Sequence, residues 1–138
     1  MLGIQDATHE EMGPEGSVYF ISKLSCSLVG ETQEVHITPG TMTFRAYGKE
    51  KTIEQFNCNY GLNEKYRNEI ERGGLKIVGV DNNGEARIVE LSNHRFFIAT
   101  LFLPQLSSSS AIPHPLIIAY MKAAMAFQVT KQKGKLKM

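Results

Sequence analysis

Apolar residues in this chain fall in short runs separated by Gly, Pro, Asn and Ser, which is typical of strands and short helices joined by tight turns. A nearly all-apolar run covers 96–103, ends at Pro104 and is followed by a Ser run at 107–110. A run of this kind predicts a strand over 96–102 that is buried on both faces, as in a parallel sheet. Helical spacing follows over 115–127. Strand, loop and helix in this order are expected at the edge of an α/β site.

Shorter β-branched and alternating runs predict the remaining strands. These strands are 18–21, 24–29, 34–37, 52–60, 75–80 and 86–91, the last two joined by a turn at 82–84. Two short helices are expected: 41–47, capped by Thr41 and closed by Gly48, and 63–72, capped by Asn63 and stopped by Gly73 and Gly74. The last helix is expected to turn an apolar face to the core, with its methionines as core filler. That face comprises Leu116, Tyr120, Met121, Ala124 and Phe127.

Composition indicates one soluble globular domain with room for a core. Of 138 residues, 42% are hydrophobic and 21% charged, and the net charge of +1 gives no general attraction to nucleic acid or membrane. No apolar segment is long enough to span a bilayer, and the N-terminus lacks the features of a signal peptide. Two separate cysteines, Cys26 and Cys58, favour a reduced, cytoplasmic protein.

The chain is expected to form a single partial domain over 1–138. Residues 1–16 are expected as a loop or helix remnant, and residues 128–138 as a frayed basic tail whose lysines lack interleaved aromatic residues. His9 lies among acids, but no second His or Cys stands at ligand spacing, so a solvated loop is favoured over a metal site. Structural roles are likewise favoured for His36, His94 and His114. No motif for a cofactor is present.

From Tyr60 onward the sequence resembles the C-terminal glutaminase domain of CTP synthase, a class I glutamine amidotransferase. Short blocks carry the resemblance in the same order along the chain. They are Tyr60-Gly61-Leu62-Asn63, Tyr66-Arg67, Gly74-Leu75, Val78-Gly79, Asn83-Gly84, Ile88-Val89-Glu90-Leu91, His94, Phe96-Phe97, Ala99, Phe102, Pro104, Pro113-His114-Pro115-Leu116 and Lys122-Ala123-Ala124. Upstream, Leu2-Gly3-Ile4, Asp6-Ala7, Gly40-Thr41 and Tyr47-Gly48 also match, so the resemblance covers nearly the whole chain.

The resemblance fails at the catalytic positions. The family's His-Pro-Glu corresponds to Leu103-Pro104-Gln105, and neither Leu103 nor Gln105 can act as base or as carboxylate. The family's Cys nucleophile would lie upstream of Met1. Asn59 stands where an Arg would hold the carboxylate of glutamine, and only Tyr60 is kept. Glutamine hydrolysis by this chain is therefore not expected.

A narrower group is closer still: the CTP synthase C-terminal region-related proteins, some of which are selenoproteins. The blocks 58–63 and 100–105 carry this likeness. A selenocysteine codon read as a stop would produce a gene prediction restarted at Met1, so the chain is either the rest of a longer protein or a genuine short protein. Translating the upstream DNA decides between the two.

These resemblances imply an α/β fold, a partial class I glutamine amidotransferase-like (flavodoxin-like) three-layer sheet with a small antiparallel extension. The open sheet edge predicts a homo-oligomer or pairing with a missing N-terminal half. The favoured function is a regulatory or small-molecule-binding protein without glutamine hydrolysis. CTP synthesis itself is not expected, because it needs an amidoligase domain and an ammonia source.

The alternative is a fragment of a thiol- or selenol-dependent enzyme whose nucleophile lies upstream. Its candidate pocket comprises Cys58, Asn59, Tyr60, Gln105 and Cys26. A reactive thiolate needs nearby positive charge, and Asn57 and Asn59 supply none. Small buried hydrophobic roles are therefore favoured for both cysteines.

Overall fold

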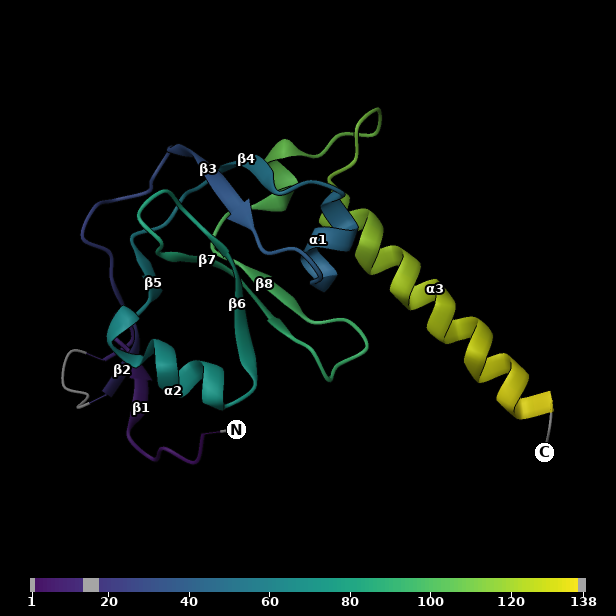
Figure 1. Cartoon of the computed structure of the whole chain (residues 1–138), viewed down its shortest axis with the longest axis horizontal. Coiled ribbons are helices and arrows are strands. Elements are labelled where there is room, and N and C mark those ends of the chain that lie inside the picture. Colours follow the sequence, from purple (N-terminus) through teal and green to yellow (C-terminus); the bar gives the residue numbers. More distant parts are fainter. Residues whose placement is uncertain (1, 14–17, 137–138) are drawn as a thin grey trace.

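The computed structural model describes residues 2–13 and 18–136 and shows two sheets and three α-helices in that part of the chain (Figure 1). The larger sheet has the order β4–β3–β6–β7–β8, and every neighbouring pair in it is antiparallel. Its strands are β3 (Thr32–Ile37), β4 (Lys51–Gln55), β6 (Leu75–Val80), β7 (Ala86–Leu91) and β8 (Ile98–Thr100). The smaller sheet joins β1 (Ala7–His9), β2 (Val18–Lys23) and β5 (Tyr60–Leu62), with β1 parallel to β2. The expected mixed α/β class is confirmed.

The apolar run 96–102 does not form a strand buried on both faces. Only β8 (Ile98–Thr100) is extended, and it lies at the sheet edge, antiparallel to β7 (Ala86–Leu91), with Ala99 exposed. Phe97 remains 40% exposed, and Phe102 enters the core only after the strand has ended. The prediction was wrong because the apolar residues of this run lie in three different places: in the turn before β8, in the edge strand itself and in the core after it. They do not cover the two faces of one strand.

Two other expected strands differ in the structure. Residues 24–29 form a loop, in which the amides of Leu24 and Leu28 donate to the carbonyls of Asn59 and Cys58 without a regular ladder. The run 52–60 is divided into β4 and β5, because Phe56 leaves the strand to fill the core at 1% exposure. One core residue therefore interrupts what the pattern presents as a continuous strand.

The short helices follow their capping signals. Helix α1 (Met42–Tyr47) begins after Thr41, whose hydroxyl accepts from the Phe44 amide at 3.0 Å, and ends at Gly48, which has φ 68°. The predicted helix 63–72 starts as a 3₁₀ turn (Glu64–Tyr66) and continues as α2 (Arg67–Arg72). The Asn63 side chain caps this turn by accepting from the Lys65 amide.

Helix α3 (Pro115–Leu136) is longer than expected and projects away from the sheets (Figure 1). Leu116 is buried in the core, but Tyr120 and Met121 are 58% and 53% exposed. The prediction of an apolar face packed on the core was therefore wrong: periodicity shows that a face is apolar, not that anything covers it. Residues 128–136, expected to fray, continue the helix. No helix in the described part of the chain has the length and apolarity to span a bilayer.

The core lies between the larger sheet, the loop 24–31 and the start of α3. It is built from Leu28, Val35, Ile37, Phe56, Val78, Ile88, Phe102 and Leu116. Phe56 and Phe102 meet edge to face, with ring centroids 5.7 Å apart. This contact fixes the segment after β4 against the segment after β8, which brings Cys58 next to 101–103.

Candidate functional site

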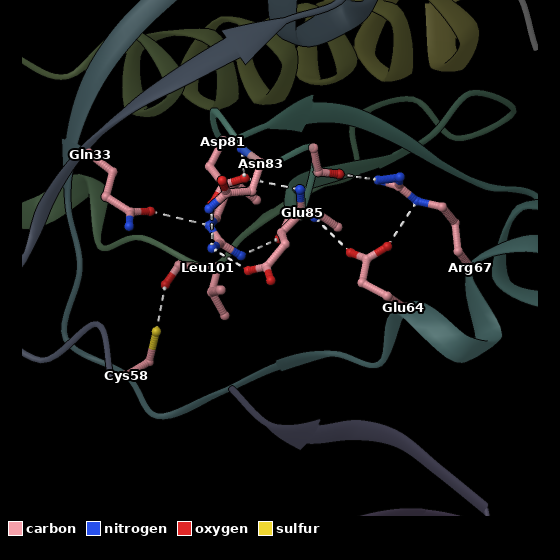
Figure 2. Close-up of polar contacts among 11 residues, drawn as sticks. Gln33, Cys58, Glu64, Arg67, Asp81, Asn83, Glu85 and Leu101 are labelled. Atoms are coloured by element: carbon pink, nitrogen blue, oxygen red, sulfur yellow. Dashed lines mark hydrogen bonds and ion pairs between the residues drawn. The ribbon is translucent and has the colours of Figure 1, made fainter. Parts of the chain in front are cut away.

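Cys58 lies between β4 and β5, half-buried beside the segment that follows β8. Its Sγ is 3.7 Å from the Leu101 carbonyl oxygen and donates to it (Figure 2). Burial raises the pKa of the Cys58 thiol, and this effect outweighs the positive charge of Arg87 and a backbone hydrogen bond at Asn57, both of which lower it. The thiol is therefore protonated at neutral pH and is a poor nucleophile.

Arg87 on β7 supplies the positive charge that the sequence around Cys58 lacks, but most of its donors are already used. Its Nη2 donates to Asp81 at 2.8 Å and to Glu85 at 2.9 Å (Figure 2). Its Nε donates to the Gln33 side chain at 3.4 Å and its Nη1 to the Ala86 carbonyl. The side chains of Arg87 and Asp81 are only 3% and 5% exposed. Arg87 therefore stabilises the β6–β7 hairpin, and four of its five N–H groups are hydrogen-bonded within the chain.

The other residues of the candidate pocket lie in the loop 24–31, at the start of β5 and on the turn after β8. Asn59 is exposed and Tyr60 is half-buried at the start of β5, where its ring centroid is 5.6 Å from that of His9. Cys26 is exposed in the loop 24–31. Gln105 is exposed on the 3₁₀ turn Pro104–Ser107. Within residues 2–13 and 18–136, no hydrogen bond joins any of these side chains to Cys58. Their role as a common site remains a prediction.

Leu103, which the sequence resemblance matches to the family's catalytic His, takes part in a hydrogen bond through its backbone. Its amide donates to the Gln55 carbonyl at 3.1 Å, which ties the segment after β8 to the end of β4. The side chain is half-buried and offers no group that exchanges a proton. The chemistry available along 103–105 is therefore that of an apolar side chain and an amide.

A buried polar cluster that the sequence analysis missed joins His114 to Glu54. The His114 Nε2 lies 3.1 Å from Glu54 Oε2, and the Tyr47 hydroxyl donates to Glu54 Oε1 at 2.6 Å. The Thr52 hydroxyl also donates to Glu54 Oε1, at 3.1 Å. The His114 Nδ1 accepts from the Leu116 amide, which assigns the imidazole proton to Nε2.

This cluster resembles a catalytic dyad but is a closed structural unit. Glu54 and His114 are 1% and 3% exposed. Burial and the neighbouring Glu54 strongly raise the pKa of the Tyr47 hydroxyl. The sequence of β4 gave no signal for this cluster, because the polar Thr52 and Glu54 are buried while the apolar Ile53 is 68% exposed. Its partner His114 is 60 residues away in sequence, so the pair could not be inferred from local pattern.

An apolar cavity of about 640 Å³ opens beside the smaller sheet and α2. It is lined by Leu2, Gly3, Ile4, Ala7, Thr8, His9, Phe20, Ile21, Leu62, Ile70 and Leu75. His9 lies in β1 rather than in a solvated loop, and its Nδ1 accepts from the Glu11 amide. The part of the chain that the structure describes contains no group of His, Cys, Asp and Glu that could hold a metal ion. The cavity can take apolar groups, and His9 is the titratable residue among the described residues that line it.

The protonation of Cys58 leads to a prediction about its reactivity. In a Cys26→Ser variant, the rate of Cys58 alkylation by iodoacetamide should rise with a midpoint above the ordinary thiol pKa of 9.0. The reason is that burial favours the neutral thiol over the thiolate. Mass spectrometry after timed alkylation from pH 7 to pH 10.5 measures the profile, with the urea-unfolded chain as control. A midpoint at or below that of the unfolded chain would contradict the prediction.

Comparison with known proteins gives a consistent relationship. No family model matches the sequence. CTP synthase from Cytophaga hutchinsonii is 31% identical over 142 aligned positions, which cover 96% of this chain and 26% of that protein. CTP synthase from Buchnera aphidicola is 37% identical over 102 residues, or 73% of this chain and 19% of that protein. The chain thus spans about a quarter or less of the length of these curated relatives.

A solved structure shares the fold. The Trypanosoma brucei CTPS glutaminase domain with bound acivicin superposes with a TM-score of 0.83 at 24% identity. The match covers 91% of this chain and 53% of that chain. Nearly all of the present structure therefore has a counterpart in the glutaminase fold, whereas almost half of the solved chain has no counterpart here.

Proposed function

This chain is homologous to the C-terminal, glutamine amidotransferase-like domain of CTP synthase, and we propose that it acts by binding rather than by hydrolysing glutamine. The proposal rests on the segment Leu103-Pro104-Gln105, which the sequence resemblance matches to the family's His-Pro-Glu. A class I amidotransferase needs a base to activate its thiol and a carboxylate to orient that base. Leu103 and Gln105 supply neither.

The surroundings of Cys58 support the same proposal. Its thiol is protonated, no imidazole or carboxylate among the described residues is hydrogen-bonded to it, and the nearby Arg87 is held by Asp81 and Glu85. Cys58 cannot substitute for the family's nucleophile without a base. A thiol- or selenol-based activity would need a nucleophile from another segment, and Arg87 would then be the one nearby charge able to favour a thiolate.

Glutamine hydrolysis is the direct test. The purified chain should release no ammonia from L-glutamine above the buffer rate, measured with a glutamate dehydrogenase coupled assay. The double change Leu103→His and Gln105→Glu should not restore release, because no activated nucleophile is present. A CTP synthase assayed in parallel serves as the positive control. Ammonia release by this chain that disappears in Cys58→Ser would refute the proposal.

We propose two apolar surfaces for binding. One is the 640 Å³ cavity beside β1, β2 and α2. The other is α3, where seven large apolar side chains are exposed. These are Ile117, Ile118, Tyr120, Met121, Met125, Phe127 and Val129. A helix that is apolar around much of its circumference is normally buried against other chain segments.

The occupant we propose is the other half of a glutaminase-like domain. Almost half of the solved T. brucei domain has no counterpart in this chain, although the fold of the shared part is the same. That complement, supplied by preceding sequence or by a second polypeptide, would cover apolar surface that a complete domain buries. The intact mass of the protein from its source tests this: a mass well above 15.4 kDa, or a co-purifying polypeptide, is expected. A homogeneous, unaccompanied 15.4 kDa protein would contradict it.

The isolated chain should self-associate through the same apolar surface. Size-exclusion chromatography with light scattering should give a dimer or larger species. Changing Met121 and Met125 to Glu should shift the chain toward the monomer, because both side chains are more than half exposed on α3. Changing the exposed Gln128 to Glu provides a charge control on the same helix. A wild-type monomer at high concentration would rule out this association.

A further inference from the structure

A basic groove lies between α1, the turn that joins β7 to β8, and α3. Its cavity has a volume of about 330 Å³ and brings together Arg45 from α1, Arg95 from the turn and Lys122 from α3. Its walls are formed by Met42, Ala46, Phe96, Ala119 and Ala123. We call this cavity the basic groove. Three elements that are distant in sequence thus present their cations to one hollow.

These cations have no acidic partner in the described part of the chain. Arg45 has only a long contact of 3.5 Å to the Gly40 carbonyl, and the Arg95 guanidinium lies over the Phe127 ring at 3.9 Å. Lys122 is exposed. Helix α3 contains no Asp or Glu from Pro115 to Leu136, and neither α1 nor the turn 92–97 contains one.

The carboxylate that contacts the α1 wall of the groove at Met42 is already occupied. Glu90 is 4% exposed, and its oxygens accept from the amides of Met42 and Thr43 and from the Thr43 hydroxyl. By contrast, Arg87 elsewhere in the fold meets two carboxylates. The basic groove therefore holds a local excess of positive charge although the chain as a whole is nearly neutral. Like charges that converge on one hollow raise its affinity for an anion.

An aromatic hollow adjoins the basic groove and shares Arg95, Phe96 and Ala123 with it. This second cavity measures about 140 Å³ and adds His94, Tyr120, Ala124 and Phe127 to the lining. The rings of Phe96 and Tyr120 meet at a centroid distance of 5.7 Å. Aromatic faces and edges of this kind accept a planar ring, and the shared Arg95 can contact both a ring and an anion.

We propose that the basic groove and the aromatic hollow together bind a phosphorylated small molecule that carries a planar aromatic ring. The phosphate contacts Arg45, Arg95 and Lys122, and the ring packs against Phe96 and Tyr120. Guanidinium and ammonium groups bind phosphate oxygens by short, charge-assisted hydrogen bonds, and two arginines give that contact direction. The inference goes beyond the proposed function: it uses neither Cys58 nor the 640 Å³ cavity, although it shares Tyr120 and Phe127 with the exposed apolar surface of α3. Its outcome is independent of the glutamine assay.

The test is a calorimetric titration of the full chain with 1-naphthyl phosphate at low salt. We expect saturable binding that is at least about tenfold tighter than binding of inorganic phosphate or of 1-naphthol, because only the ester engages both hollows. The changes Arg45→Glu and Lys122→Glu should each weaken it by about tenfold or more. The control is Arg72→Glu, which reverses an exposed charge on α2, away from the basic groove, and should leave the affinity unchanged.

Circular dichroism melting confirms that each variant is folded before titration. Absence of saturable binding by 1-naphthyl phosphate would overturn the proposal. Equal losses in Arg72→Glu and Lys122→Glu would also overturn it, because they would indicate attraction to overall charge. Phosphate or 1-naphthol binding as tightly as the ester would show that one hollow acts alone, which contradicts a site for an aromatic phosphate.

Discussion

Replacing Arg87 by Met is expected to lower the free energy of unfolding by about 3–5 kcal/mol. The change leaves the Asp81 carboxylate, 5% exposed, without its cationic partner, whereas Glu85 is 35% exposed and can be hydrated. Asp81 cannot turn to water easily, because its Oδ1 accepts from the amides of Asn83 and Glu85 in the β6–β7 turn. Urea denaturation followed by circular dichroism measures the loss.

Two further variants separate charge burial from general disruption. Lys51→Met removes a surface ion pair with Glu34, whose side chains are 59% and 36% exposed, and should cost about 1 kcal/mol or less. Adding Asp81→Asn to Arg87→Met should recover part of the stability, since the amide oxygen still accepts from the turn while the buried charge is gone. Equal costs for Arg87→Met and Lys51→Met would refute this account.

Removing Arg87 also acts on Cys58. The Arg87 charge lowers the pKa of the Cys58 thiol against the larger opposing effect of burial. Its loss therefore makes the thiol still less acidic, so the surroundings of Cys58 and the stability of the β6–β7 hairpin depend on the same guanidinium.

Local signals were sufficient where a few neighbouring residues determine the conformation. Thr41 and Gly48 set the limits of α1, and the strands 75–80 and 86–91 pair as their turn at 82–84 predicts. The resemblance to the family could also be recognised from the sequence, because short matching blocks occur in the same order along the chain. Each of these features is determined by residues that lie close together in the sequence, which is why the sequence alone predicts them.

Contacts between side chains that are distant in sequence could not be predicted in the same way. Arg87 lies 29 positions from Cys58 and Glu54 lies 60 positions from His114, so neither pair leaves a local pattern. The predictions that the run 96–102 and the apolar face of α3 are buried were wrong for a related reason. An apolar side chain is more stable when buried, but whether it is buried depends on another element being present to cover it.

The single change Tyr47→Phe should alter how the free energy of unfolding depends on pH above 10. The pKa of the Tyr47 hydroxyl is strongly raised in the folded chain by burial and by Glu54, whereas in the unfolded chain it keeps the ordinary value of 10.0. Folding therefore favours the neutral phenol. The resulting stabilisation is complete below pH 10 and is lost as the pH rises above 10, at about 1.4 kcal/mol per pH unit for this one group.

Tyr47→Phe should accordingly lower the free energy of unfolding by about 1.5–3 kcal/mol at pH 7, because the 2.6 Å hydrogen bond to the Glu54 carboxylate is lost. Above pH 10 its stability should fall less steeply than that of the wild type, so the two curves converge. Urea denaturation at pH 7, 9, 10, 11 and 11.5 measures both curves. Tyr120→Phe, at a side chain 58% exposed, is the control and should follow the wild type throughout.

Parallel curves for wild type and Tyr47→Phe above pH 10 would mean that the Tyr47 phenol ionises as readily in the folded chain as in the unfolded one. The buried cluster of Tyr47, Glu54 and His114 would then be open to water, and a catalytic role for His114 would have to be reconsidered.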